Sequence, residues 1–181
     1  MRTSKKARIL DAAISLINRE GVHAVTYEAV ANESGLTRGG LLYHFPSRED
    51  LLRGIDERLV ETWRNSMEAI LGKPAEAATP YERHQAFAEI SAKNATRAEV
   101  MFMLESAAES GKRPAWVEGL QYWAPKPPTT PDPADLDAFV ARLAADGLWV
   151  YEVMNYGSLD ASQKARIVGR IKELLSPDAA E

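Results

Sequence analysis

The sequence predicts an all-α fold of about nine helices, and three observations support this class. Apolar residues recur at every third or fourth position along most of the 181-residue chain. The alternating patterns typical of strands are nearly absent, and glycine or proline interrupts the helical pattern at intervals. The hydrophobic content of 45% is sufficient for one or two domains with a buried core.

Three short helices are expected within the first 45 residues. The segment "KARILDAAISLINRE" places its apolar residues on one face, and Gly21 offers a stop. Thr26 can cap a second helix, "YEAVANES", which stops at Gly35. The third helix lies in "GLTRGGLLYHF", where Thr37 is a suitable N-cap.

Further helices are expected beyond residue 46. Ser47 and Asp50 form a capping-box pattern before a helix at 48–71, which would be about 35 Å long. Others are expected at 81–94, 96–110, 134–156 and 160–175, and a short apolar segment, "AWVEGLQYW", lies before the proline-rich stretch. The segment "APKPPTTPDP" is predicted to be an extended loop, because prolines fill half of its positions. We divide the chain into domains at 1–46 and 47–181.

Composition argues against several classes of protein. The chain has no cysteine, so disulfides, thiolate nucleophiles and cysteine metal sites are excluded. His23, His44 and His84 have no partner cluster, and no glycine-rich phosphate loop is present. No apolar run approaches the roughly 18 residues of a membrane span, and no signal peptide is visible. We expect a cytoplasmic protein without a membrane partner, catalytic site, metal or cofactor.

Charge is distributed unevenly along the chain. The net charge is −4. Residues 1–53 carry eight Lys/Arg against six Asp/Glu, a balance of +2, whereas the remainder carries 14 against 20, a balance of −6. This asymmetry fits local contact with DNA by the N-terminal part.

Gly39 and Gly40 lie side by side in the third predicted helix, where each glycine lowers helix stability by about 1 kcal/mol relative to alanine. Their presence therefore calls for an explanation. Two short helices joined at Gly35 form a helix-turn-helix pattern, whose second helix enters the major groove of DNA. Without side chains, the helix backbone can approach base edges and phosphates closely. Thr37 and Arg38 at the helix start can then reach a phosphate and a guanine edge.

Four more side chains of this segment are candidates for contacts with the DNA backbone. Tyr43 and His44 can donate hydrogen bonds to phosphate oxygens, and Arg48 adds a positive charge at the start of the next helix. Thr26, at the start of the second helix, is a candidate phosphate anchor.

The stretch from about residue 6 to residue 52 resembles the N-terminal domain of the TetR family of transcriptional regulators. The resemblance lies in "ILDAAISLINREG", "VTYEAVANESGLTRGGLLYHF" and "SREDLL". The segments "MRTSKK", "GLLYHFPSR" and "AADGLWVYE" are similar to the multidrug-binding repressors of efflux pumps in actinobacteria. The resemblance implies a DNA-binding domain at 1–46 and a ligand-binding and dimerisation domain at 47–181. It places DNA contacts at Thr26, Thr37, Arg38, Gly39, Gly40, Tyr43, His44 and Arg48.

Leu42 departs from the family pattern, because the family often has tyrosine at this position. Its side chain either contacts a thymine methyl group or packs inward.

Large aromatic and apolar side chains after residue 60 form the candidate ligand site. The candidates are Trp63, Met67, Phe87, Phe102, Glu105, Trp116, Trp123 and Trp149. Residues of this kind at helical spacing also form ordinary cores, so both interpretations stay open. Glu105 is acidic within an apolar run, and an aromatic cage with one carboxylate suits a planar or quaternary cation.

The last two long helices are predicted to form a homodimer seam. Small residues are interspersed with large ones in "ADLDAFVARLAADGLWVYEVM", and "QKARIVGRIKELL" carries an apolar stripe. Small residues allow close approach of helices, so a four-helix seam with a second copy is expected, as the resemblance also implies. The alternative is that these helices pack only within one chain.

We therefore predict a transcriptional repressor that binds a palindromic double-stranded DNA operator as a homodimer. A small-molecule inducer, aromatic or cationic and drug-like, would release it. One alternative is an activator, or a regulator that needs its ligand as corepressor. An enzyme fused to a DNA-binding head and an adaptor whose head binds protein are two functions of a different class.

Overall fold

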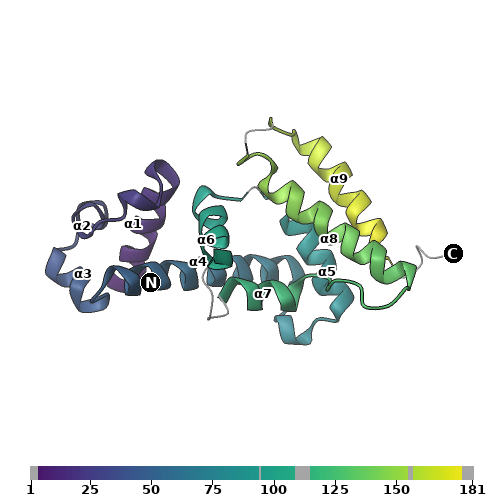
Figure 1. Ribbon diagram of the computed structural model, residues 1–181, viewed down its shortest axis with the longest axis horizontal. Helices are drawn as coiled ribbons and strands as arrows, with labels where there is room; N and C mark the ends of the chain where they lie inside the picture. The colour runs from purple at the N-terminus through teal and green to yellow at the C-terminus, as the bar shows by residue number, and fades with distance from the viewer. Residues whose placement is uncertain (1–3, 94, 109–114, 155–156, 177–181) are drawn as a thin grey trace. The chain divides into compact units, whose positions relative to one another are not determined.

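The structure is a computed structural model that describes residues 4–93, 95–108, 115–154 and 157–176, without the side chains of 105–108 and 115–117. Within these ranges the chain forms nine α-helices, two short 3₁₀ helices and no strand, which confirms the all-α class (Figure 1). In chain order the elements are α1 (Lys5–Glu20), η1 (Val22–Ala24), α2 (Tyr27–Ser34), α3 (Arg38–His44), α4 (Arg48–Leu71), η2 (Ala75–Ala77), α5 (Pro80–Ile90), α6 (Arg97–Ala108), α7 (Ala115–Trp123), α8 (Pro133–Tyr151) and α9 (Ala161–Leu174).

The predicted helix stops and the start of α4 are confirmed by local geometry. Gly21 ends α1 at φ 93° and Gly35 ends α2 at φ 64°, conformations that favour glycine. At the start of α4 the Ser47 hydroxyl accepts a hydrogen bond from the Asp50 N–H at 3.0 Å. Asp50 Oδ2 accepts one from the Ser47 N–H at 3.2 Å, which completes the capping box.

Two helices end earlier than predicted. The helix predicted at 81–94 ends at Ile90, and Ser91 turns its hydroxyl back to the Ala88 carbonyl at 2.6 Å. The helix predicted at 134–156 ends at Tyr151. The carboxylate of the next residue, Glu152, accepts a hydrogen bond from the Leu159 N–H and forms an ion pair with Lys164 of α9. It therefore stabilises the turn into the following helix.

The described residues divide into two compact units, and the first comprises residues 1–61 and 96–116. Its core is built from α1, α2, α3 and the first part of α4, with Ala98 and Phe102 of α6 buried among them. The N–H of Ala98, in the first turn of α6, donates a 2.9 Å hydrogen bond to Asn18 Oδ1 of α1. An orphan donor of a helix start is thereby satisfied by another helix.

The second unit comprises residues 62–95 and 117–181. It contains the end of α4 together with α5, α7, α8 and α9. Helices α8 and α9 lie side by side (Figure 1). Gln85 of α5 donates a hydrogen bond to the Lys172 carbonyl of α9 at 3.2 Å, and Lys172 in turn pairs with Glu89 at 2.7 Å. The domain boundary expected between residues 46 and 47 stays a prediction.

Candidate nucleic-acid interface and ligand site

The turn between α2 and α3 is held in place from two sides. Gly35 adopts the left-handed conformation that closes α2, and the N–H of Leu36 donates to the Ala31 carbonyl at 3.1 Å. From α1, Arg8 Nη2 donates to the Ser34 carbonyl at 2.6 Å. The end of α2 is therefore capped by a charged side chain, which fixes the direction in which α3 begins.

Both threonines of the predicted interface are N-caps, as predicted. Thr26 Oγ1 accepts from the Ala29 N–H and Thr37 Oγ1 accepts from the Gly40 N–H, each at 3.1 Å. Both threonines are exposed. Each hydroxyl accepts a hydrogen bond and donates none to the described residues, so its hydrogen is available for an external acceptor such as a phosphate oxygen.

Helix α3 has one buried side and one open side. Leu41 is fully buried in the core of the first unit, whereas Tyr43 is 83% exposed. Arg38 and Gly39 are also exposed. A Cβ atom placed on Gly39 would meet nothing within 4 Å, so the bare backbone here is not required by packing in the free protein. The open side of α3 thus combines a cationic side chain, an aromatic hydroxyl and an uncovered stretch of backbone.

The remaining predicted contacts of this helix lie towards its end. The rings of Tyr43 and His44 meet edge to face, with centroids 5.2 Å apart, and His44 is partly buried. Leu42 is 37% exposed, so its side chain is not buried in the core. Gly40 is partly buried, and a Cβ there would approach Thr37 Oγ1 at 3.3 Å, which gives this second glycine a packing reason.

Two arginines of the candidate interface have no acidic partner. Among the described residues, neither Arg38 nor Arg48 forms a hydrogen bond or an ion pair through its side chain, and both are exposed. Nearby arginines are engaged instead: Arg19 pairs with Glu33 at 2.8 Å, and Arg53 pairs with Asp50. The starts of α3 and α4 therefore each present a cation without an acidic partner, and a phosphate can be bound there without breaking an internal ion pair.

Tyr27 and Phe45, which no sequence motif marks as a pair, help to hold the candidate interface in place. Tyr27 Oη donates a hydrogen bond to the Phe45 carbonyl at 2.8 Å, and the Lys6 ammonium lies over the Phe45 ring at 5.8 Å from its centroid. Burial raises the pKa of Tyr27, and the charge of Asp50 acts in the same direction, so the phenol stays a proton donor. No sequence motif marks the pair of Tyr27 and Phe45, because the two residues are 18 positions apart.

Three predicted ligand residues meet in the second unit, and a fourth, Met67, is buried in the same unit. The ring of Trp63 contacts Phe87 and Trp123 edge to face, with centroids 6.3 and 6.2 Å apart. All three are buried, and Met67 is fully buried. These side chains form a packed aromatic core here, which we call the Trp63 cluster, and a ligand among them would have to displace one of them.

The structure describes the side chains of two of the remaining four predicted ligand residues, Trp149 and Phe102. Trp149 is partly buried on α8 in the same unit, and its carbonyl accepts from the Ala95 N–H at 2.9 Å. Phe102 belongs to the core of the first unit. The side chains of Glu105 and Trp116 lie outside the described residues.

Neither a metal site nor a membrane-spanning element is found in the described part of the chain. This part contains no group of three or more His, Cys, Asp or Glu side chains placed to hold a metal ion. No described helix is both long and apolar enough to cross a membrane.

Both the N-terminal and the C-terminal parts of the chain match models of known protein families. Residues 9–55 match the model of the bacterial regulatory proteins of the tetR family, and residues 81–176 match the tetracyclin repressor-like C-terminal domain. The transcriptional regulator RutR of Escherichia coli is 31% identical over 67 residues, which cover 37% of this chain and 32% of RutR. The chain thus spans about a third of the length of these curated relatives.

A second relative and a solved structure match over more of their length. The transcriptional repressor KstR2 of Mycobacterium tuberculosis is 27% identical over 160 residues, covering 81% of this chain and 79% of KstR2. A transcriptional regulator from Saccharomonospora viridis, solved with choline, aligns over 96% of both chains with a TM-score of 0.66 and 22% identity. The relatives named here are transcriptional regulators, not enzymes.

Proposed function

The chain belongs to the TetR family of bacterial transcriptional regulators, and from that membership we propose that it is a ligand-responsive repressor that binds a palindromic operator as a homodimer. The observation that carries the DNA-binding part is the open side of α3. There, Arg38, Gly39 and Tyr43 are exposed, and the cations at the starts of α3 and α4 are free of acidic partners in the described structure.

The proposed contacts divide into base readout and backbone anchoring. Arg38 reads a guanine edge in the major groove, where its guanidinium matches the O6 and N7 acceptors. The Thr26, Thr37, Tyr43 and Arg48 side chains bind phosphate oxygens on either side. Gly39 allows the backbone of α3 to lie against the groove, since no Cβ stands between them.

Dimerisation is supported by an apolar stripe on α8. Leu136, Val140 and Leu143 recur at helical spacing, and each is more than two-fifths exposed. Gly147 on the same line is exposed and has open space around it, which allows a second helix to approach closely. An exposed apolar line of this length on a helix is typical of an interface between subunits.

The Trp63 cluster is the proposed ligand-responsive element. A ligand that inserts between Trp63 and its neighbours would displace a side chain of α4, the helix that begins at Arg48 in the DNA-binding unit. A coupling of about 1–3 kcal/mol between the two sites would weaken operator binding about 5- to 150-fold. A cluster of aromatic rings favours planar or quaternary cations, and the Saccharomonospora viridis regulator bound to choline is consistent with such a ligand.

The test is operator binding by the full chain with and without a cationic dye. Genomic fragments that the protein retains would be selected, and the affinity for the tightest fragment measured by fluorescence anisotropy. Ethidium is a suitable dye if quenching of tryptophan fluorescence is measured separately without DNA, because ethidium also binds DNA. Quenching with loss of operator binding would support an induced repressor. Quenching with tighter operator binding would indicate a corepressor, and the absence of any retained fragment would contradict the proposal.

A further inference from the structure

The second unit contains a cleft whose lining includes none of the three rings of the Trp63 cluster. Its volume is about 400 Å³, within the range of small-molecule sites. Its walls come from α5, the end of α7, the proline-rich loop at 124–129 and the start of α8. The residues used below are Arg83, His84, Tyr122, Lys126 and Asp135, all of which line it.

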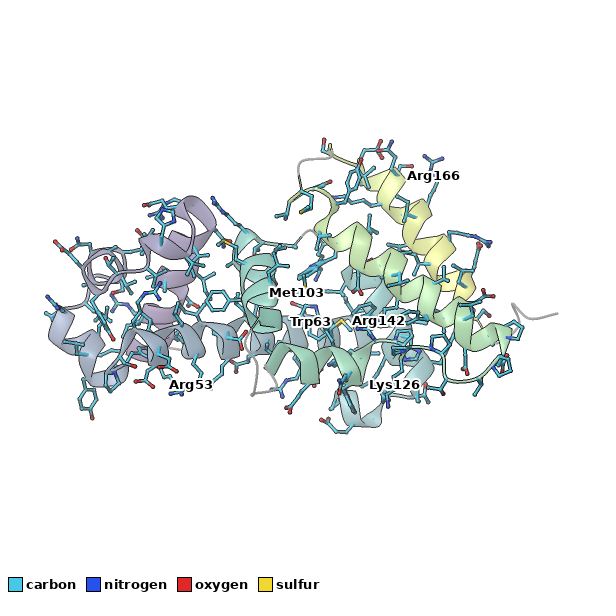
Figure 2. All side chains as sticks on the ribbon, viewed as in Figure 1. Arg53, Trp63, Met103, Lys126, Arg142 and Arg166 are labelled. Carbon is cyan, nitrogen blue, oxygen red and sulfur yellow. The ribbon has the colours of Figure 1, made fainter. Side chains whose placement is uncertain are left out.

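The cleft presents more positive than negative charge. Arg83 and Lys126 are its two cations, and Asp135 is the one carboxylate among its lining residues. Asp135 is already engaged, because it accepts a hydrogen bond from the Thr130 hydroxyl. Lys126 is exposed and has no ion pair with the part of the chain that the structure describes (Figure 2).

Arg83 is rigidly held, yet most of its donors are unused. Its guanidinium lies over the Tyr122 ring, 4.5 Å from the centroid. Nε donates to the Tyr122 carbonyl at 3.2 Å and Nη1 donates to the Ala78 carbonyl at 2.6 Å. Of the five N–H groups of a guanidinium, the remaining three have no acceptor among the described residues.

His84 is a partly buried polar group without a partner. Its imidazole forms no hydrogen bond with the residues that the structure describes. Burial lowers the pKa of His84, and the neighbouring charge of Arg83 lowers it further. A partly buried imidazole with unused donor capacity normally binds a solvent molecule or a ligand.

The shape of the loop is fixed independently of any ligand. Arg142 Nη1 on α8 donates to the Pro125 carbonyl at 2.8 Å, and the Arg142 side chain pairs with Asp146 at 3.6 Å (Figure 2). Prolines at 125, 127 and 128 further restrict the loop. The lining residues Asp135 and Ala138 lie on a different face of α8 from the line of Leu136, Val140 and Leu143, so the proposed dimer leaves the cleft open.

We propose that this cleft binds a small organic carboxylate, with the carboxylate held by Lys126, Arg83 and His84 and an apolar body lying between the Tyr122 ring and the prolines of the loop. The inference goes beyond the regulator proposed above, because it concerns a second site of opposite charge preference. It requires neither operator binding nor a ligand at the Trp63 cluster.

The test uses three probes of the same size and different charge: benzoate, benzyl alcohol and benzylammonium. The chain has three histidines, so its imidazole proton signals can be assigned with His23→Gln and His44→Gln variants. Benzoate in the millimolar range is expected to shift the His84 signal and raise the pKa of His84. The neutral and cationic probes are expected to bind more weakly, and the signals of His23 and His44 should stay in place.

A matched pair of variants locates the site. Lys126→Gln is expected to weaken benzoate binding about 3- to 10-fold, because one charge-assisted contact is lost. Lys93→Gln removes another exposed cation of the same unit that does not line the cleft, and should leave binding unchanged. An unshifted His84 signal, equal shifts with all three probes, or equal effects of the two variants would overturn the proposal.

Discussion

Tyr27 Oη donates a 2.8 Å hydrogen bond to the carbonyl oxygen of Phe45, which joins the first residue of α2 to the residue that follows α3. The bond fixes both ends of the helix-turn-helix unit, since Arg8 already holds the turn between the helices. The position of α3 is therefore set by the protein before any DNA is bound, and preorganisation of this kind lowers the cost of binding.

Tyr27→Phe removes this hydrogen bond and keeps the ring in place. We expect the free energy of unfolding to fall by about 0.5–1.5 kcal/mol, because the Phe45 carbonyl loses its partner in a partly buried position. Operator affinity should fall as well. Chemical denaturation and anisotropy measure the two effects, and an unchanged operator affinity would show that the bond does not position α3.

Gly39→Ala separates folding from DNA binding. The new methyl group has open space in the free protein, and alanine favours a helix over glycine by up to about 1 kcal/mol. The variant should therefore be at least as stable as the parent chain in thermal unfolding, yet bind operator more weakly because the methyl group lies between α3 and the groove. A more stable variant with full operator affinity would exclude close backbone approach at this position.

Arg38 and Arg48 are expected to act differently on DNA. Arg38→Ala should cost about 1–3 kcal/mol on the preferred operator and relax its sequence preference, since a base contact is lost. Arg48→Ala should weaken binding to all sequences. It should also reduce the slope of log affinity against log salt concentration by about one per subunit. Arg64→Ala removes an exposed cation outside the candidate interface and serves as the control. Equal salt dependence in all three variants would contradict these roles.

The apolar stripe on α8 is tested by a charge placed within it. Leu143→Glu puts a carboxylate on the exposed apolar line and should convert the dimer to monomers in analytical ultracentrifugation. Ala134→Glu adds the same side chain to an exposed position on another face of α8 and should leave the dimer intact. A monomeric parent chain, or a dimer that survives Leu143→Glu, would contradict the proposed seam.

Acid should destabilise the start of α5 through Glu82. The hydrogen bond from Lys73 Nζ at 2.7 Å, followed by that from the Thr79 N–H, lowers the pKa of Glu82 from 4.5 to about 2. A carboxyl whose pKa is lower in the folded state stabilises the fold above its unfolded value, and this contribution is lost as pH falls from 4.5 towards 2.

Glu82→Gln should therefore lower the melting temperature at neutral pH and flatten its fall below pH 4.5. The exposed Glu76 has no side-chain hydrogen bond within the described residues, so Glu76→Gln is the control. Melting temperatures followed by circular dichroism from pH 7 to pH 2 provide the comparison. Parallel curves for the parent chain and Glu82→Gln would contradict the assignment.

Local signals in the sequence were enough to place most helix ends. Caps such as Thr26, Thr37 and the Ser47–Asp50 pair act within three residues, so their chemistry can be read directly from the sequence. Where a helix end depends on a distant partner, as at Glu152 with Leu159 and Lys164, spacing alone extended the helix too far.

The tertiary environment of the aromatic residues could not be derived from spacing. Trp63, Phe87 and Trp123 come from three different helices, and only the fold shows that they meet. Phe102 is also an aromatic residue in an apolar helical segment, but it lies in the core of the first unit. The cleft beside Tyr122 was missed for the same reason, since Arg83 is far from Lys126 and Asp135 in the sequence.

The central claim is that α3 enters the major groove at two half-sites of one operator. Dimethyl sulfate protection of a selected DNA fragment tests it most directly, because the reagent methylates guanine N7 in the major groove. We expect two protected patches about 34–36 Å apart along the duplex, and loss of protection at one guanine in each patch with Arg38→Ala. A single protected patch, or binding that leaves every guanine N7 reactive, would contradict it.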